Sequence, residues 1–289
     1  MPSQAVQRPP WYSINADARL FWLSCIVTIL LSFKQLSFNL STQLLLMINL
    51  IIGLPHGASD FLWIQKNTTG VATCLVGCVG YLSVVLLCIW AWVNFPPLAL
   101  AVFLALSAYH FGQDWENKGT FWQVTAGLSA ISIPYMMWPE ETLFLFQLIT
   151  FDHPVHPLIT TSLASGFWVG LCWCAIQLQQ QRWQYAEVLM LYLIGYIVQP
   201  LAFFTLYFCS LHSIRHYRLT VKQQVITPSQ IYLMLTIAAT CAGSIIMISH
   251  HMIVIASDVN LTGFATLFIA LFALTVPHCL IHRIKSHTH

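Results

Sequence analysis

The chain is a succession of apolar runs, most of them long enough to cross a lipid bilayer as a helix. A membrane-spanning helix needs about 20 mainly apolar residues. Charged residues make up only 7% of the 289 residues, whereas soluble domains carry about 25%. Because so little charge cannot cover a surface in water, the sequence predicts an all-α, polytopic integral membrane protein. The apolar runs lie at about 18–33, 41–64, 71–94, 97–112, 121–138, 156–178, 185–217, 229–252 and 262–284.

The run at 185–217 is too long for one span, because a continuous helix over these residues would extend about 50 Å. Gln199 and Pro200 lie near its middle, and proline removes a helical hydrogen bond. We therefore divide the run into two short spans, 185–199 and 201–217. The division gives a bundle of about 10 transmembrane helices.

The positions of lysine and arginine orient these spans, since cytoplasmic segments of membrane proteins are enriched in both residues. With the N-terminus inside, ten spans place Arg215, Arg218 and Lys222 on the cytoplasmic side, and the outer loops carry only Lys34. Nine spans, the alternative, would move that basic cluster outside. We therefore expect a multi-pass protein of the cell inner (cytoplasmic) membrane with both termini in the cytoplasm.

One membrane-embedded domain is expected over residues 1–289, with a polar N-terminal segment at 1–17 and the helical bundle at 18–284. The first apolar run ends without a small-residue cleavage site, so we interpret it as a span and not as a cleaved signal. The amphipathic stretch 139–155 is predicted to be an interfacial loop. The net charge of +2 is too small to indicate a nucleic-acid partner.

Twelve histidines occur in this apolar chain, and the ten-span arrangement places six of them in the cytoplasmic half of the membrane. Polar residues within a membrane are costly, so each one is a candidate for function. Two histidines in the C-terminal tail, two on the surface of the predicted loop and two at the outer end of a span are set aside: His287, His289, His153, His156, His250 and His251. The other six lie in or at the inner ends of spans that run inwards: His56, His110, His212, His216, His278 and His282.

The spacing of these histidines favours a metal site. His212 and His216 are four residues apart, so their side chains lie on one helix face and can bind one ion. Neutral imidazole suits iron, copper or zinc, whereas magnesium and calcium prefer oxygen ligands. For His278 and His282, contact with lipid headgroups is an equally weighted interpretation. The joint pattern predicts a histidine-rich metal site in the cytoplasmic half of the protein.

Two features of the sequence next to these histidines support a metal site. Asp60 follows His56 by four residues, so it is a candidate to orient that histidine; a salt bridge to a neighbouring helix is the alternative. Gly57 and Gly112 flank candidate ligands, where the missing side chain lets a helix or a substrate approach.

Four segments, "GLPHGASD", "SAYHFGQ", "SLHSIRH" and "VPH", occur in an order and at separations that resemble the Brp/Blh family of bacterial and archaeal β-carotene 15,15′-dioxygenases. The similarity covers roughly residues 40–284. The resemblance implies an integral membrane, non-haem iron enzyme that cleaves β-carotene with O₂ into two molecules of retinal. It also implies a retinal-binding rhodopsin as the acceptor of the product.

Carried over by motif, the resemblance makes His56, His110, His212 and His216 the Fe²⁺ ligands and the catalytic centre. His278 matches a further Pro-His of the family. Together with Asp60 it is a candidate to hydrogen-bond or orient the ligands.

A hydrocarbon substrate needs a tunnel of apolar and aromatic side chains that opens to the lipid. Most aromatic residues of membrane proteins serve packing or the membrane interface. Five of them adjoin the candidate ligands and are therefore candidates to line the tunnel: Trp63, Tyr109, Phe111, Tyr207 and Phe208.

Two other function classes stay open. A membrane desaturase or hydroxylase with two irons is one, since "HSIRH" and "HCLIH" both fit H-x-x-x-H, although no H-x-x-H-H occurs. A metal or proton transporter lined by histidine is the other. A transporter should show polar residues through the full depth of several spans, whereas here they gather in one leaflet. Iron content per chain distinguishes the first alternative, and transport into proteoliposomes the second.

Overall fold

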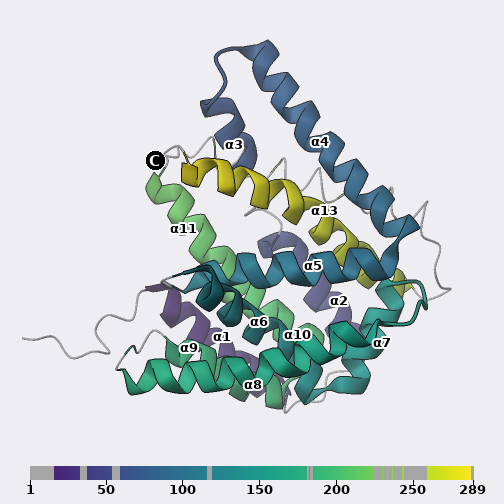
Figure 1. The fold of residues 1–289 in the computed structure, drawn as a ribbon, viewed down its shortest axis with the longest axis vertical. Coiled ribbons are helices and arrows are strands. Elements are labelled where there is room, and N and C mark those ends of the chain that lie inside the picture. Colours follow the sequence, from purple (N-terminus) through teal and green to yellow (C-terminus); the bar gives the residue numbers. More distant parts are fainter. Residues whose placement is uncertain are drawn as a thin grey trace, which may run out of the picture.

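The computed structural model describes residues 16–32, 38–53, 59–115, 119–180, 182, 185–223, 230, 233, 236, 243 and 259–287. All regular structure in these residues is helical (Figure 1), as the sequence predicted. The helices are α1 (Ala16–Ser32), α2 (Phe38–Ile48), η2 (Asn49–Gly53), α3 (Ser59–Lys66), α4 (Val71–Asn94), α5 (Pro96–Phe111), η4 (Gly112–Asp114), α6 (Thr120–Met137), α7 (Pro139–Ile149), α8 (Pro157–Gln179), α9 (Ala186–Ile197), α10 (Pro200–Leu206), η6 (Tyr207–His212), α11 (Ser213–Gln223) and α13 (Val259–His287).

Three helices in the described part of the chain are long and apolar enough to cross a membrane: α4, α8 and the segment Gly263–Ile281 of α13. Their length and composition indicate a membrane protein, and the predicted count of about ten spans is not confirmed by them. Three shorter apolar helices accompany them, at Arg19–Leu30, Thr42–Ile52 and Ala186–Ile197.

The predicted break in the long run at 185–217 is confirmed, because α9 ends at Ile197 and α10 begins at Pro200. That its two parts are separate spans stays a prediction. From Pro200 the chain continues through α10, η6 and α11 as one helical stretch. Proline occupies the first turn of α10, where its missing N–H breaks no hydrogen bond.

The interfacial loop predicted at 139–155 is wrong over its first part, which forms the helix α7. Pro139 begins this helix and two glutamates stand in its first turn, an arrangement that suits a helix N-terminus. Its last two residues, Leu148 and Ile149, are buried, and the indole N–H of Trp92 donates to the carbonyl of Ile149 at 2.7 Å. The chain after α7 carries His153 and His156, which are both exposed as predicted.

Helix α6 packs against α5 and α8 through small residues. A Cβ atom on Gly127 would overlap the carbonyl of Ala108, and one on Gly112 would overlap the carbonyl of Gln123. The backbones of α5 and α6 are therefore in direct contact, and the predicted role of Gly112 in helix approach is confirmed. This contact fixes the C-terminal end of α5, which carries His110.

Helix α13 lies across α4 and α5 (Figure 1), and it also contacts α2 and α7. Its segment from Phe264 to Ala273 is largely buried, so the helix forms part of the core. Helix α4 buries only residues of its C-terminal half and exposes an apolar face over the rest. The fold thus brings together the C-terminal ends of α5 and η6, the first turn of α11 and the later part of α13.

Candidate metal centre

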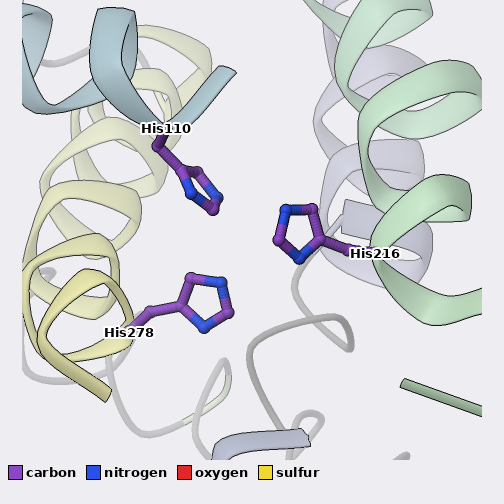
Figure 2. A group of neighbouring side chains, drawn as sticks. All are labelled: His110, His216 and His278. Carbon is purple, nitrogen blue, oxygen red and sulfur yellow. The ribbon is translucent and has the colours of Figure 1, made fainter. Parts of the chain in front are cut away.

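Four histidines from four different elements gather in the interior of the protein. The ring centroid of His110 lies 4.7 Å from that of His212, 4.8 Å from that of His216 and 5.0 Å from that of His278. All four residues are buried. Figure 2 shows the rings of His110, His216 and His278 pointing toward one another from α5, α11 and α13. We call these four residues the histidine cluster.

The cluster has the size of a site for one ion. The candidate ligand atoms of His110, His216 and His278 lie within 4.8 Å of one another, and so do those of Asp114, His212 and His216. Two imidazole nitrogens bound to one zinc ion lie roughly 3–4 Å apart, because each metal–nitrogen bond measures about 2.0–2.1 Å. Both sets share His216, so this residue links them.

The sequence-predicted ligands are only partly placed by the structure. It brings His110, His212 and His216 together, and it adds His278, whose predicted place was around the ligands. His56 lies outside the described residues, as do His250, His251 and the side chain of His282. The predicted role of His56 as a ligand therefore stays a prediction.

A π-helical turn carries His212 into the cluster. The segment η6 runs from Tyr207 to His212, and its residues five apart lie one above the other. Two side chains of η6 therefore reach the same carboxylate: the hydroxyl of Tyr207 donates to Oδ2 of Asp114 at 2.6 Å, and Nδ1 of His212 lies 3.1 Å from both carboxylate oxygens. Single π-helical turns within α-helices are frequent at functional sites.

Two aspartates each contact Nδ1 of one imidazole ring of the cluster. Asp114 binds His212 in this way, and Oδ2 of Asp60 lies 2.8 Å from Nδ1 of His278. The side chains of both aspartates are 1% exposed. Asp60 therefore contacts a histidine of another helix, which was the alternative expectation for it, and its relation to His56 lies outside the described residues.

Asp114 was not recognised as a site residue from the sequence. A signal was present, because Asp114 follows His110 by four residues just as Asp60 follows His56. Asp60 was expected either to orient His56 or to pair with a neighbouring helix, and no role was predicted for Asp114. In the structure Asp114 and Asp60 instead bind histidines 98 and 218 residues away.

A partly buried ion pair holds the backbone of Asp114. Arg215 donates from Nη1 to the backbone carbonyl of Asp114 at 2.8 Å, and from Nη2 to both carboxylate oxygens of Glu187 at 2.7 and 2.6 Å. The indole of Trp115 also donates to Glu187, at 3.2 Å. These contacts tie α9 and α11 to the end of η4.

The charges joined to the cluster by these hydrogen bonds sum to minus two in the described part of the chain. Three carboxylates (Asp60, Asp114 and Glu187) contribute three negative charges and Arg215 contributes one positive charge. Neutral imidazoles add none. Buried charge is stable only when it is paired or binds a metal, so the surroundings suit a divalent cation, and nitrogen ligands favour a transition metal.

An apolar pocket adjoins the cluster, and its unfilled space amounts to about 710 Å³ when the part open to the surroundings is included. It lies between α5, α6, α7, α10 and α13. Phe111 and Tyr207 form its wall next to the cluster, since the ring of Phe111 lies 4.8 Å from that of His212. Along α5 the lining runs from Phe111 to Phe103, a helical distance of about 12 Å.

Of the five aromatic residues predicted to line a tunnel, Phe111 and Tyr207 line this pocket. Phe208 stacks on His212 at 5.6 Å and on Phe204, a pocket residue, at 5.1 Å. Tyr109 is exposed on α5, and Trp63 is half-buried on α3; both lie outside the lining of this pocket.

Comparison with known proteins gives a consistent result. Residues 47–284 match the family model described as beta-carotene 15,15′-dioxygenase. The chain is 30% identical over 250 residues to the "Beta-carotene 15,15′-dioxygenase" of an uncultured marine bacterium, across 80% of this chain and 88% of the relative. It is 25% identical over 199 residues to the "Probable beta-carotene 15,15′-dioxygenase Blh" of Halobacterium salinarum, across 57% of this chain and 58% of the relative. No solved structure matches the chain.

Proposed function

Since the chain belongs to the β-carotene 15,15′-dioxygenase family, we propose that it cleaves β-carotene with O₂ at the central double bond and releases two molecules of retinal. The observation that supports this proposal most is the buried histidine cluster beside an apolar pocket. The cluster suits a redox-active metal, and the pocket suits a hydrocarbon. Neither the buried cluster nor the apolar pocket suits a charged substrate.

We assign Fe²⁺ to the histidine cluster. The ligands that follow from the family motifs are His56, His110, His212 and His216. The position of His278 beside His110 and His216, with Nδ1 held by Asp60, favours it as a further ligand. When bound, the iron would supply the redox chemistry by which O₂ attacks the double bond.

The residues around the cluster would keep water from the reacting bond. His212 is fully buried beneath the rings of Phe111 and Phe208, at 4.8 and 5.6 Å. Excluding water prevents side reactions of reactive intermediates and strengthens electrostatic interactions within the site. The aromatic wall thus serves the metal centre as well as the pocket.

The pocket would hold one half of the symmetrical polyene. If the central double bond lies at the cluster, the chain on one side can follow α5 from Phe111 toward Phe103. The lining there is almost wholly apolar, with Phe203, Phe204 and Phe268 among its residues. This path runs along α5 and past Phe111 and Tyr207, two of the five aromatic residues that the sequence suggested as tunnel lining.

The membrane setting completes the proposal. β-Carotene dissolves in the bilayer core, so it would enter from the lipid of the inner membrane, and O₂ would enter as co-substrate. We propose ten spans with both termini in the cytoplasm. Retinal leaves as an apolar aldehyde, and a retinal-binding rhodopsin is the proposed acceptor.

The direct test is to purify the protein in detergent, load it with Fe²⁺ and add β-carotene under air. We expect about one iron per chain, because the four rings form a single cluster, and retinal as the product. Two irons per chain would favour the desaturase-like alternative. Absence of retinal from iron-loaded, folded protein would contradict the proposed reaction.

The proposed topology predicts where a membrane-impermeant thiol reagent reacts. In a variant without native cysteines, single cysteines replacing Lys66 and Lys222 should react only after the cytoplasmic side is exposed. Both follow spans that run inwards, so they belong to the same side. A cysteine in place of Lys34 is the control, since it should react from outside. If the cysteine at position 222 reacted from outside, the ten-span arrangement would be wrong.

A further inference from the structure

Each of two buried aspartates holds one histidine of the cluster from a different helix. We propose that Asp60 and Asp114 are positioning residues that set the orientation, the tautomer and the charge of the metal site. This inference rests on the proposed function only in so far as the histidine cluster binds a metal. It assigns roles to two side chains that do not themselves have to touch the ion.

The carboxylate of Asp114 is fixed in place from several directions. Nδ1 of His212 and the hydroxyl of Tyr207 bind its oxygens at 3.1 and 2.6 Å, and Arg215 binds its backbone carbonyl at 2.8 Å. Its side chain is 1% exposed. A carboxylate held in this way cannot swing, so the ring of His212 that it binds has a fixed direction.

Asp60 repeats the arrangement on the other side of the cluster. Its Oδ2 lies 2.8 Å from Nδ1 of His278, and both side chains are nearly fully buried. The two pairs come from unrelated parts of the chain, because Asp60 lies on α3 and Asp114 ends η4. The same geometry therefore arises twice, independently, around one cluster.

A hydrogen bond from Nδ1 to a carboxylate decides the chemistry of the ring. Neutral imidazole carries one proton, so a proton on Nδ1 leaves the lone pair on Nε2. In metal sites such a carboxylate partner fixes the tautomer and raises the basicity of the ligand nitrogen. His212 and His278 are thereby prepared to bind an ion through Nε2.

The aspartates also supply the charge that an ion needs. Glu187 is paired with Arg215, at 2.6 Å, so these two charges cancel. The two remaining negative charges are those of Asp60 and Asp114, which equal the charge of a divalent cation. Replacing either aspartate by asparagine keeps the shape of the side chain, removes one of these charges and weakens the preference for a proton on Nδ1.

Glu187 provides a matched control. It is a buried carboxylate in the same hydrogen-bonded region, but its partners are Arg215 and Trp115 and no imidazole. A general effect of removing buried negative charge should therefore appear in Glu187→Gln as well. A positioning effect should appear only in Asp60→Asn and Asp114→Asn.

The experiment is a titration of metal-free protein in detergent with Co²⁺, whose visible absorption reports the geometry of its ligands. We expect Asp60→Asn and Asp114→Asn each to bind Co²⁺ about 10–100-fold more weakly than the wild type, with altered absorption bands. Glu187→Gln removes one charge but no contact to an imidazole, so it should lose less affinity than either aspartate variant and keep the wild-type bands. Thermal unfolding of each variant identifies those that are folded. The two aspartate variants test the proposed positioning role independently of each other.

Wild-type affinity and bands in both aspartate variants would overturn the inference, and so would an equal loss in Glu187→Gln. A wild-type protein that binds no Co²⁺ would contradict the metal site of the proposed function itself. The two failures are therefore distinguishable in one set of titrations.

Discussion

Replacing His216 by alanine should remove iron binding and carotenoid cleavage together. Its ring lies 4.8, 4.7 and 5.5 Å from those of His110, His212 and His278, and it belongs to both groups of candidate ligand atoms. Loss of a residue that merely supports a ligand costs about 10–100-fold, so loss of a central ligand should cost more than about 100-fold in turnover. Iron analysis and retinal formation measure the two effects.

The protein should still be inserted and folded, because alanine brings no charge and no polar group into the interior. His153→Ala is the matched control, since His153 is an exposed histidine of the same chain. We expect the same loss for His212→Ala. Normal iron content and normal turnover in His216→Ala would show that the cluster is not the metal site.

Narrowing the pocket should strongly reduce turnover of β-carotene without removing iron. Ala130 lines the pocket from α6 and is 1% exposed, so leucine at this position would project into the unfilled space. Added volume in a packed core costs typically 1–3 kcal/mol, and free space in the pocket reduces that cost. We expect a fall in turnover of at least about tenfold, equivalent to about 1.4 kcal/mol.

Ala101→Leu is the control for added volume, because Ala101 lies on α5 outside the pocket lining and is only partly buried. Retinal formation and iron content of both variants are compared at several β-carotene concentrations. Iron-loaded Ala130→Leu with wild-type turnover would mean that the substrate follows another path.

The amino-acid sequence alone predicted a large part of this fold. Low charge and long apolar runs indicate a helical membrane protein, and Pro200 marks the break between α9 and α10. The convergence of His110, His212 and His216 followed from counting spans, since alternate spans end on the same side. The interfacial segment at 139–155 was harder, because an amphipathic sequence does not distinguish a short helix such as α7 from a loop.

The contacts between distant segments could not be read from spacing. Asp114 is four residues after His110, and helical spacing suggests that the two belong together. The chain instead leaves α5 through the short turn η4, which points the carboxylate at η6. A π-helical turn brings Tyr207 and His212 to this carboxylate. Because the turn depends on the packing of neighbouring helices, no local sequence pattern predicts it.

The crossed pairs Asp60–His278 and Asp114–His212 have a consequence for biogenesis. A membrane protein is synthesised and inserted from its N-terminus, so His278 is among the last side chains to reach the bilayer, after Asp60 has already been buried. The cation cannot be enclosed until α13 has arrived. Under the proposed function, iron would therefore be loaded only after α13 has been inserted. A chain truncated before α13 would keep a buried aspartate without its histidine partner and an incomplete metal site.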